Sequence, residues 1–100
     1  MRRDDARRTL IAYDVPDDKR RTKIAKELGA YGDRVQYSVF IVDIIPSRLM
    51  TLRAALKEII DASSDSVLFC DLGRVVDLDG KRFGYLGVER TVTDNDTLVL

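Results

Sequence analysis

Two prolines constrain the fold of this 100-residue chain more than any other feature, because each directly follows an apolar run of strand-forming residues. Residues 9–15 (TLIAYDV) precede Pro16, and residues 34–45 (RVQYSVFIVDII) precede Pro46. Proline has no backbone N–H to donate to a sheet, so each run is predicted to be strand that ends at its proline. The second run is long enough for one bent strand or two short strands, and both alternatives stay open.

An amphipathic segment follows each proline. The first is expected to begin at Asp17–Asp18, because carboxylates cap free N–H groups there, and to end at Gly29 or Gly32. The second is expected over residues 48–62, with Ser47 as its N-cap. Both segments repeat leucine, isoleucine and alanine at helical spacing, which predicts one buried stripe on each helix.

The last third of the chain predicts further β-structure. Residues 67–72 (VLFCDL) are a strand candidate, and residues 74–86 (RVVDLDGKRFGYL) indicate a hairpin that turns at Asp79–Gly80. Residues 83–100 end in TLVL, which is too short to bury itself. We expect this tail to pair with a sheet edge on a partner chain, and a disordered tail is the alternative.

Strands that alternate with two helices predict one α+β domain over residues 1–100. The expected architecture is a ferredoxin-like sandwich, with both helices on one face of an antiparallel sheet. Residues 1–8 (MRRDDARR) are polar and are expected to be flexible. A domain this small buries only part of its surface, so a partner chain would add stability.

The absence of histidine limits the possible chemistry. Serine–histidine and cysteine–histidine triads are excluded within one chain, and zinc is disfavoured because only one cysteine, Cys70, is present. A metal would therefore be a hard cation held by carboxylates and water. We expect Mg²⁺, and Mn²⁺ is the alternative. Cys70 lies in an apolar run and is expected to be a buried structural thiol.

The sequence also predicts where the protein works. No apolar run approaches the ~20 residues that a bilayer-spanning helix needs, and the charged N-terminus lacks a signal-peptide pattern. We therefore expect a cytoplasmic protein with no membrane partner.

Asp14 is the most informative carboxylate, because it ends the otherwise apolar strand LIAYD just before a helix. A rigid strand aims such a side chain into an open crevice, as catalytic and metal-binding groups require. The alternative is that it only caps the helix or solvates the turn. A single carboxylate is a poor magnesium site, but a two-fold dimer would bring two copies of Asp14 together.

Cations and aromatic residues follow Asp14 in the sequence. Arg20, Arg21 and Lys23 are candidate phosphate ligands, and the alternative is an ordinary solvated helix face. Tyr37 and Phe40 either stack on bases or contribute to the core or the dimer interface. Tyr13 is expected to be a structural or interface residue. The polar strand residues that are candidate phosphate or water ligands are Arg34, Gln36 and Ser38.

Read together, these segments resemble the CRISPR-associated protein 2 family over residues 10–72. The resemblance rests on a strand ending in YD, then DKRRTKIAKEL, then YGDRVQYSVF, and then a helix followed by DSVLF. It implies a ferredoxin-like homodimer that exchanges a C-terminal strand. It also implies a role in CRISPR spacer acquisition, in which the dimer bridges subunits of the CRISPR-associated integrase and binds double-stranded DNA.

The resemblance further implies metal-dependent endonuclease activity on single-stranded RNA or double-stranded DNA. The family's acidic residue at the end of the first strand corresponds to Asp14, preceded here by Tyr13. Its basic residues at the helix start correspond to Arg20 and Arg21, and its R-V-Q-x-S-V-F segment begins at Arg34. The alternatives are a purely structural adaptor and a toxin-like ribonuclease of related fold.

Overall fold

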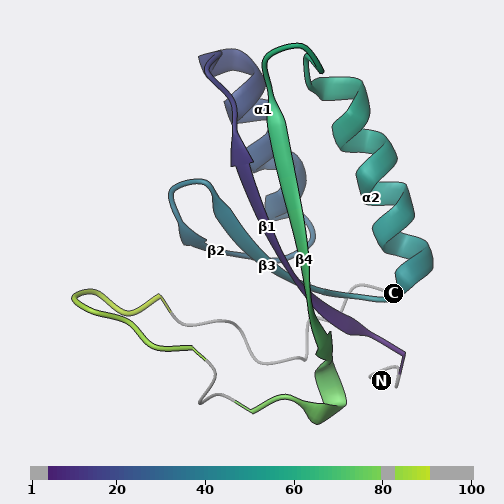
Figure 1. The fold of residues 1–100 in the computed structure, drawn as a ribbon, viewed down its shortest axis with the longest axis vertical. Helices are drawn as coiled ribbons and strands as arrows, with labels where there is room; N and C mark the ends of the chain where they lie inside the picture. The colour runs from purple at the N-terminus through teal and green to yellow at the C-terminus, as the bar shows by residue number, and fades with distance from the viewer. Residues whose placement is uncertain (1–4, 80–82, 91–100) are drawn as a thin grey trace.

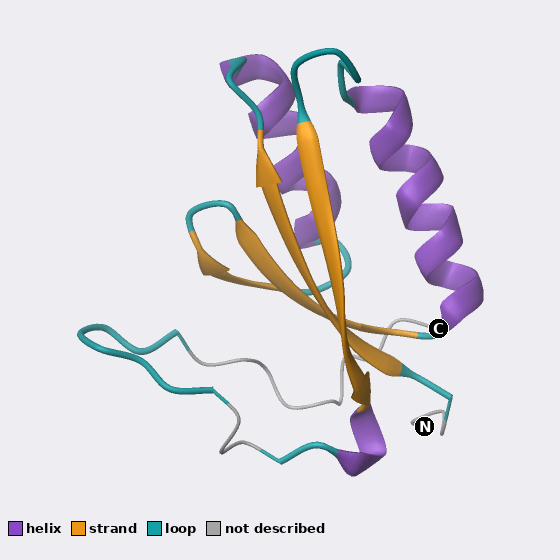
Figure 2. Ribbon diagram, viewed as in Figure 1, coloured by secondary structure: helices purple, strands orange, loops and turns teal. Residues whose placement is uncertain are grey.

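The computed structural model describes residues 5–79 and 83–90, which form an antiparallel sheet covered by two helices (Figures 1 and 2). The strand order is β2-β3-β1-β4, and every neighbouring pair is antiparallel. This arrangement confirms the predicted ferredoxin-like fold. The elements in chain order are β1 (Arg7–Asp14), α1 (Asp18–Gly29), β2 (Asp33–Gln36), β3 (Val39–Ile44), α2 (Pro46–Ile59), β4 (Ser66–Arg74) and the 3₁₀ turn η1 (Val75–Asp77).

Strand β1 is central, because β3 pairs with one of its edges and β4 with the other. It begins at Arg7, so Arg7 and Arg8 belong to the sheet, whereas the sequence analysis expected them to be part of a flexible end. Arg8 faces Asp43 across the β1–β3 ladder and donates to both carboxylate oxygens, Nε to Oδ1 at 2.6 Å and Nη2 to Oδ2 at 2.7 Å. Only 12% and 11% of the two side chains are exposed, so a paired, well-shielded charge lies within the sheet.

One hydrophobic core lies between the sheet and the two helices. Side chains alternate along a strand, so β1 contributes every second residue, including Ile11 and Tyr13, to this face. Both helices pack their apolar stripes against the same face, and within residues 5–79 and 83–90 the other face of the sheet carries no helix. The buried residues of this core are Ile11, Tyr13, Val15, Ile24, Leu28, Phe40, Val42, Ile44, Leu52 and Leu56.

The two helices differ in how they begin. Asp17 caps α1 as predicted, because its carboxylate accepts a hydrogen bond from the N–H of Arg20 at 2.9 Å. The prediction of Ser47 as the cap of α2 is wrong: Ile45 is the N-cap, and Pro46 occupies the first turn, where its missing N–H needs no partner. Among the described residues, neither helix has the length and hydrophobicity of a membrane-spanning segment.

The apolar run after residue 33 forms two strands, which settles the alternative that the sequence left open. Tyr37 and Ser38 form the turn between β2 and β3. Gly32 brings the start of β2 very close to β3, since a Cβ at this position would collide with the backbone oxygen of Ile41 and lie 2.9 Å from Val42 Cα.

The hairpin predicted for residues 74–86 is wrong. Val75 begins the 3₁₀ turn η1, and residues 83–90 contain no strand. The reason is a small second core, in which Val75 packs with Ala6 and Ile45 and donates its N–H to Ala6 O at 3.0 Å. Gly80 of the predicted turn and residues 91–100 of the predicted pairing tail lie outside the described residues.

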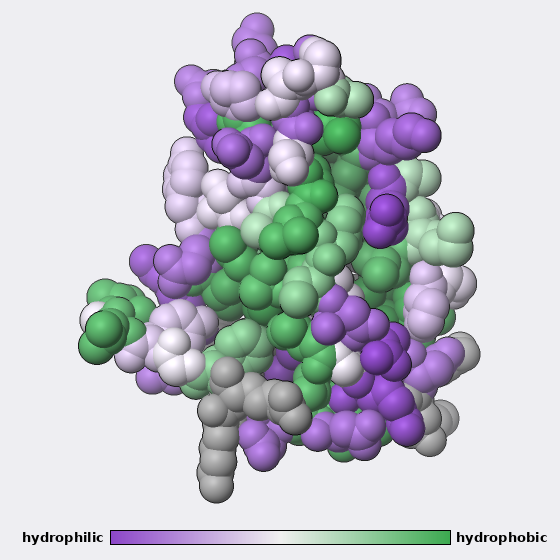
Figure 3. Space-filling view, in the orientation of Figure 1, coloured by the Kyte–Doolittle hydropathy of each residue, from purple (hydrophilic) through white to green (hydrophobic). Residues whose placement is uncertain are grey.

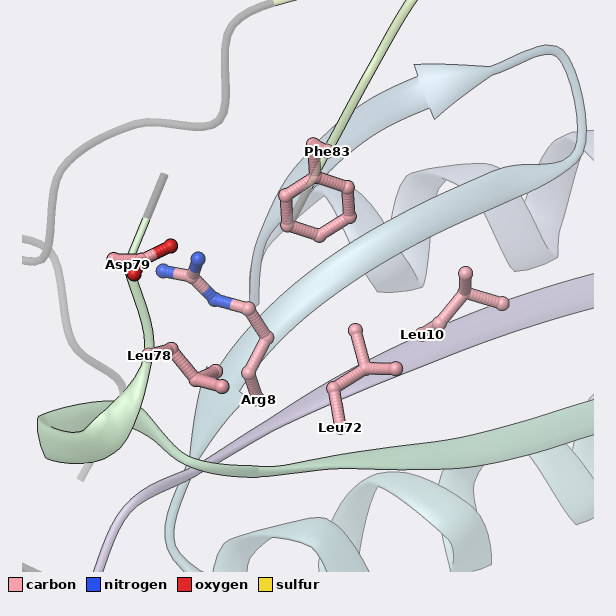
Figure 4. A pocket seen from close by; sticks show the side chains of 6 residues that line it. All are labelled: Arg8, Leu10, Leu72, Leu78, Asp79 and Phe83. Atoms are coloured by element: carbon pink, nitrogen blue, oxygen red, sulfur yellow. The ribbon is translucent and has the colours of Figure 1, made fainter. Parts of the chain in front are cut away.

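The helix-free face of the sheet, which we call the open face, is apolar along its middle, where hydrophobic side chains gather in Figure 3. Leu10 and Ala12 alternate onto it from β1, and their partners on β4 are Cys70 and Leu68. Cys70 is therefore exposed, and the prediction of a buried thiol is wrong. At one end of the face Phe83 approaches from the segment after η1, over a pocket lined by Arg8, Leu10, Leu72, Leu78 and Asp79 (Figure 4).

Replacing Gly32 by alanine tests the close approach of β2 to β3. We expect Gly32→Ala to lower the free energy of unfolding by about 1–3 kcal/mol, because the added methyl group meets backbone atoms that cannot rotate away. Gly29→Ala is the matched control: its Cβ meets nothing within 4 Å, and alanine favours the helix end by up to about 1 kcal/mol. Urea unfolding of both variants provides the measurement, and equal stabilities would contradict this account of the fold.

Candidate functional site

Asp14 is the last residue of β1 and its side chain is exposed. It pairs with Ser66 of β4, and because Tyr13 before it points into the core, Asp14 alternates onto the open face. The cap of α1 is Asp17, and no side chain in the described part of the chain pairs with Asp14. The helix-capping alternative for Asp14 is therefore excluded, and its carboxylate is free to meet a ligand.

The β2–β3 turn lies beside the end of β1 and is held there by hydrogen bonds. Arg34 donates from Nε and Nη2 to the carbonyl oxygen of Tyr37, at 3.0 and 2.7 Å. The Tyr13 hydroxyl donates to the same oxygen at 3.4 Å, and the Tyr13 N–H donates to Ser38 O at 3.0 Å. This network holds the turn and the strand that carries Asp14 in one rigid arrangement.

The three aromatic residues of this region divide into two kinds. Tyr13 and Phe40 are core residues, with ring centroids 6.3 Å apart, and only 5% and 3% of them is exposed. Tyr37 is 70% exposed. The core interpretation therefore holds for Tyr13 and Phe40, whereas the Tyr37 ring projects from the turn.

Arg21 brings a second cation to the same region from α1. Its Nη1 donates to Val15 O at 2.8 Å, and its Nη2 contacts the Asp18 carboxylate. The hydrogen bond to Asp18, and secondarily the neighbouring Tyr37 hydroxyl, raise the pKa of Arg21 above its ordinary value, so the group stays positive. A shallow groove is lined by Asp18, Arg21, Thr22, Ala25, Arg34 and Tyr37.

Arg20 points elsewhere and ties α1 to the loop before β4. It donates to the Asp65 carboxylate from Nε at 2.7 Å and from Nη2 at 3.0 Å, and also reaches Ser64 Oγ at 3.3 Å. The Asp65 side chain has no exposed area. The guanidinium of Arg20, with smaller contributions from the Asp61 N–H and Ser64, lowers the pKa of Asp65 to about 2. Arg20 thus has a structural role, and its contact with nucleic acid stays a prediction.

The remaining candidates lie on the surface around the turn. Lys23 is exposed on α1, and Gln36 is exposed on β2, where it lines a second hollow with Arg34, Tyr37 and Arg90. The structure thus brings Arg21, Arg34 and Tyr37 to one groove, while Lys23 does not line it. The residue missed by the sequence analysis is Asp65, whose pairing with a residue 45 positions away has no local signal.

The donor set of one chain does not fit a divalent cation alone. Among residues 5–79 and 83–90, no three histidine, cysteine, aspartate or glutamate side chains gather closely enough to hold a metal ion. Mg²⁺ is commonly held by one or two carboxylates and several waters. The exposed Asp14 carboxylate fits such a site once a second carboxylate reaches it from another chain.

Comparisons with known proteins give a consistent result. The sequence model of the family described as CRISPR associated protein Cas2 matches residues 7–77. A Chloroflexus aurantiacus protein named "CRISPR-associated endoribonuclease Cas2 3" is 40% identical over 86% of this chain and 89% of its own length. A Synechocystis protein of the same name is 46% identical over 63% of this chain and 68% of its own. The crystal structure of Streptococcus pyogenes Cas2 at pH 6.5 superposes with a TM-score of 0.70 and 34% identity, covering 80% of this chain and 99% of that one.

The Arg20–Asp65 pair predicts how stability depends on pH. Because the pKa of Asp65 is lower in the folded protein than its ordinary 3.8, the pair stabilises the fold above about pH 4, and this contribution is lost as the pH falls toward about 2. We expect Asp65→Asn to be less stable than the parent at neutral pH, with a difference that shrinks across that window. Urea unfolding midpoints measured between pH 7 and pH 2 test this, with Glu58→Gln on the exposed side of α2 as the control. A difference that does not change with pH would disprove the assignment.

Proposed function

The chain belongs to the CRISPR-associated protein Cas2 family, and from this membership we propose that it is a homodimeric, metal-dependent endonuclease that acts in CRISPR spacer acquisition. Relatives named endoribonuclease or endonuclease Cas2 support the phosphodiesterase activity. The observation that carries the proposal is the position of Asp14, an exposed carboxylate with no partner among the described residues, beside the β2–β3 turn where Tyr37 lines a groove with Arg21 and Arg34.

The open face supports the homodimer. It presents Leu10, Ala12 and Leu68 on the side of the sheet that has no helix, and Leu68 is 58% exposed. An apolar face on a small domain is stabilised when a second copy covers it. Asp14 lies on the same side of β1 as Leu10 and Ala12, so a two-fold axis through this face would bring two copies of Asp14 toward each other.

A pair of Asp14 carboxylates would hold Mg²⁺ or, alternatively, Mn²⁺. When bound, such a cation supplies charge stabilisation at a phosphoryl oxygen. The chain's own residues position the substrate: Arg21 offers a planar guanidinium to phosphate oxygens, and Arg34 and Tyr13 hold the adjacent turn in place. Dimerisation is then a requirement for cleavage, since one chain contributes only one carboxylate.

The adaptor role is the second part of the proposal. A site with one carboxylate per chain is sparse, which favours weak cleavage and a main role in bridging subunits of the CRISPR-associated integrase. Double-stranded DNA is the expected ligand in that role, and single-stranded RNA is an additional candidate substrate. The phosphate ligands that remain in the proposal are Arg20, Arg21, Lys23, Arg34, Gln36 and Ser38. The cytoplasm is the expected compartment.

Asp14→Asn tests the active site. We expect magnesium-dependent cleavage of RNA and duplex DNA to fall by about 100-fold or more, because the amide lacks the negative charge with which the carboxylate attracts a divalent cation. The fold and the elution volume in gel filtration should not change, since Asp14 has no partner among the described residues. Cleavage is followed on labelled oligonucleotides across a range of pH with Mg²⁺, Mn²⁺ or EDTA. Undiminished cleavage by the variant would place the active site elsewhere, and spacer acquisition that survives in the variant would establish the adaptor role as primary.

Leu68→Asp tests the dimer. A charge on the open face should convert the dimer to monomer and abolish cleavage together with dimerisation, because an apolar interface does not accommodate an unpaired carboxylate. Met50→Asp is the matched control, since Met50 is 73% exposed on α2, away from that face. Sedimentation at several protein concentrations gives the oligomeric state of each variant. If Met50→Asp dissociates the dimer and Leu68→Asp does not, the interface lies on the helix side.

A further inference from the structure

Tyr37 is unusual because its ring is exposed while its backbone is held firmly. Seventy per cent of the residue is exposed at the tip of the β2–β3 turn. Its carbonyl oxygen nevertheless accepts hydrogen bonds from Nε and Nη2 of Arg34 and from the Tyr13 hydroxyl. An exposed aromatic ring on a restrained turn contributes nothing to the core, but it presents a flat apolar surface that loses little entropy when a ligand binds.

The surroundings of the ring select the kind of ligand. The Arg34 guanidinium carbon lies 5.5 Å from the Tyr37 ring centroid, within cation–π range. Arg34 and Tyr37 line both neighbouring hollows: Arg21 lines one, and Gln36 and Arg90 line the other. The hydrogen bonds to Val15 and Asp18 engage only part of the five N–H groups of Arg21. An aromatic ring between guanidinium groups is suited to a ligand that combines a flat base with phosphates.

We infer that Tyr37 is a stacking platform for an unpaired base of single-stranded nucleic acid, with Arg21 contacting a phosphate of the same strand. The inference rests on the proposed function and makes it more specific. Base pairs in a duplex are stacked on each other and do not offer a free face, so this platform selects unpaired nucleotides next to Asp14. Since every base has a π-face, the platform recognises an unpaired base without reading its identity.

Oligonucleotides that lack bases separate stacking from phosphate binding. The binding of labelled single strands is compared with that of strands of equal length whose central nucleotides are abasic, in RNA and DNA versions. We expect Tyr37→Ala to weaken binding of the intact strand about tenfold, as for the loss of one stacked base, and to leave binding of the abasic strand unchanged. Tyr37→Phe, which keeps the ring, should bind as the parent does. The salt dependence should be the same for the parent and Tyr37→Ala, because no phosphate contact is lost.

Fluorescence gives a second readout. The chain contains no tryptophan, so Tyr37→Trp places a single indole at the proposed platform. We expect its emission to be quenched by the intact strand and not by the abasic one. Arg21→Gln, in contrast, should weaken binding of both strands and reduce the salt dependence.

Three outcomes would overturn the inference. The first is that Tyr37→Ala weakens the binding of both strands equally, and the second is that duplex binds while single strands do not. The third is that Tyr37→Ala dissociates the dimer, which would make Tyr37 an interface residue. The proposed function is tested separately, by cleavage that depends on Asp14. If the parent and Tyr37→Ala bind the intact strand equally while cleavage still depends on Asp14, only the stacking platform is refuted. If binding depends on the bases but no cleavage is observed, only the nuclease is refuted.

Discussion

The pairing of β1 with a neighbour on each edge is the constraint on which the rest of the structure depends. Once β3 and β4 are both hydrogen-bonded to β1, the two crossover helices cover one face and leave the other open. The same pairing decides where the end of the strand points. Tyr13 is directed into the core and Asp14 away from it, so one strand supplies both the anchor of the β2–β3 turn and the candidate catalytic carboxylate. A slip by one residue would exchange those two directions.

Much of the architecture follows from signals that act over a few residues. Prolines after strand-forming runs, an aspartate at the start of α1 and leucines at helical spacing are local, and the structure agrees with them. The errors arise where distant contacts override local preference. Val75 has strand propensity but packs against Ala6 and Ile45, and Cys70 lies in an apolar run but on the face that no helix covers. Neither fact is encoded near the residue concerned.

The candidate site shows the same division. The sequence predicted Asp14 at a strand end and the cations that follow it, because strand ends and helix starts can be recognised locally. It did not separate the roles of adjacent arginines: Arg21 lines the groove with Tyr37, whereas Arg20 is turned toward Asp65. Neighbours on a helix differ in direction by about a quarter turn, so one faces the groove and the other the α2–β4 loop. Only the three-dimensional arrangement reveals which of the two serves the site.

The shielded pair of Arg8 and Asp43 has a consequence for how the chain assembles. These charges lie opposite each other in the β1–β3 ladder, and both side chains are largely shielded from solvent. If the two strands aligned one step out, Arg8 would face Val42 or Ile44 and its shielded pairing with Asp43 would be lost, which is less favourable than the correct alignment. The pair thus adds an electrostatic preference for the correct strand alignment to the preference that the alternating apolar side chains already impose.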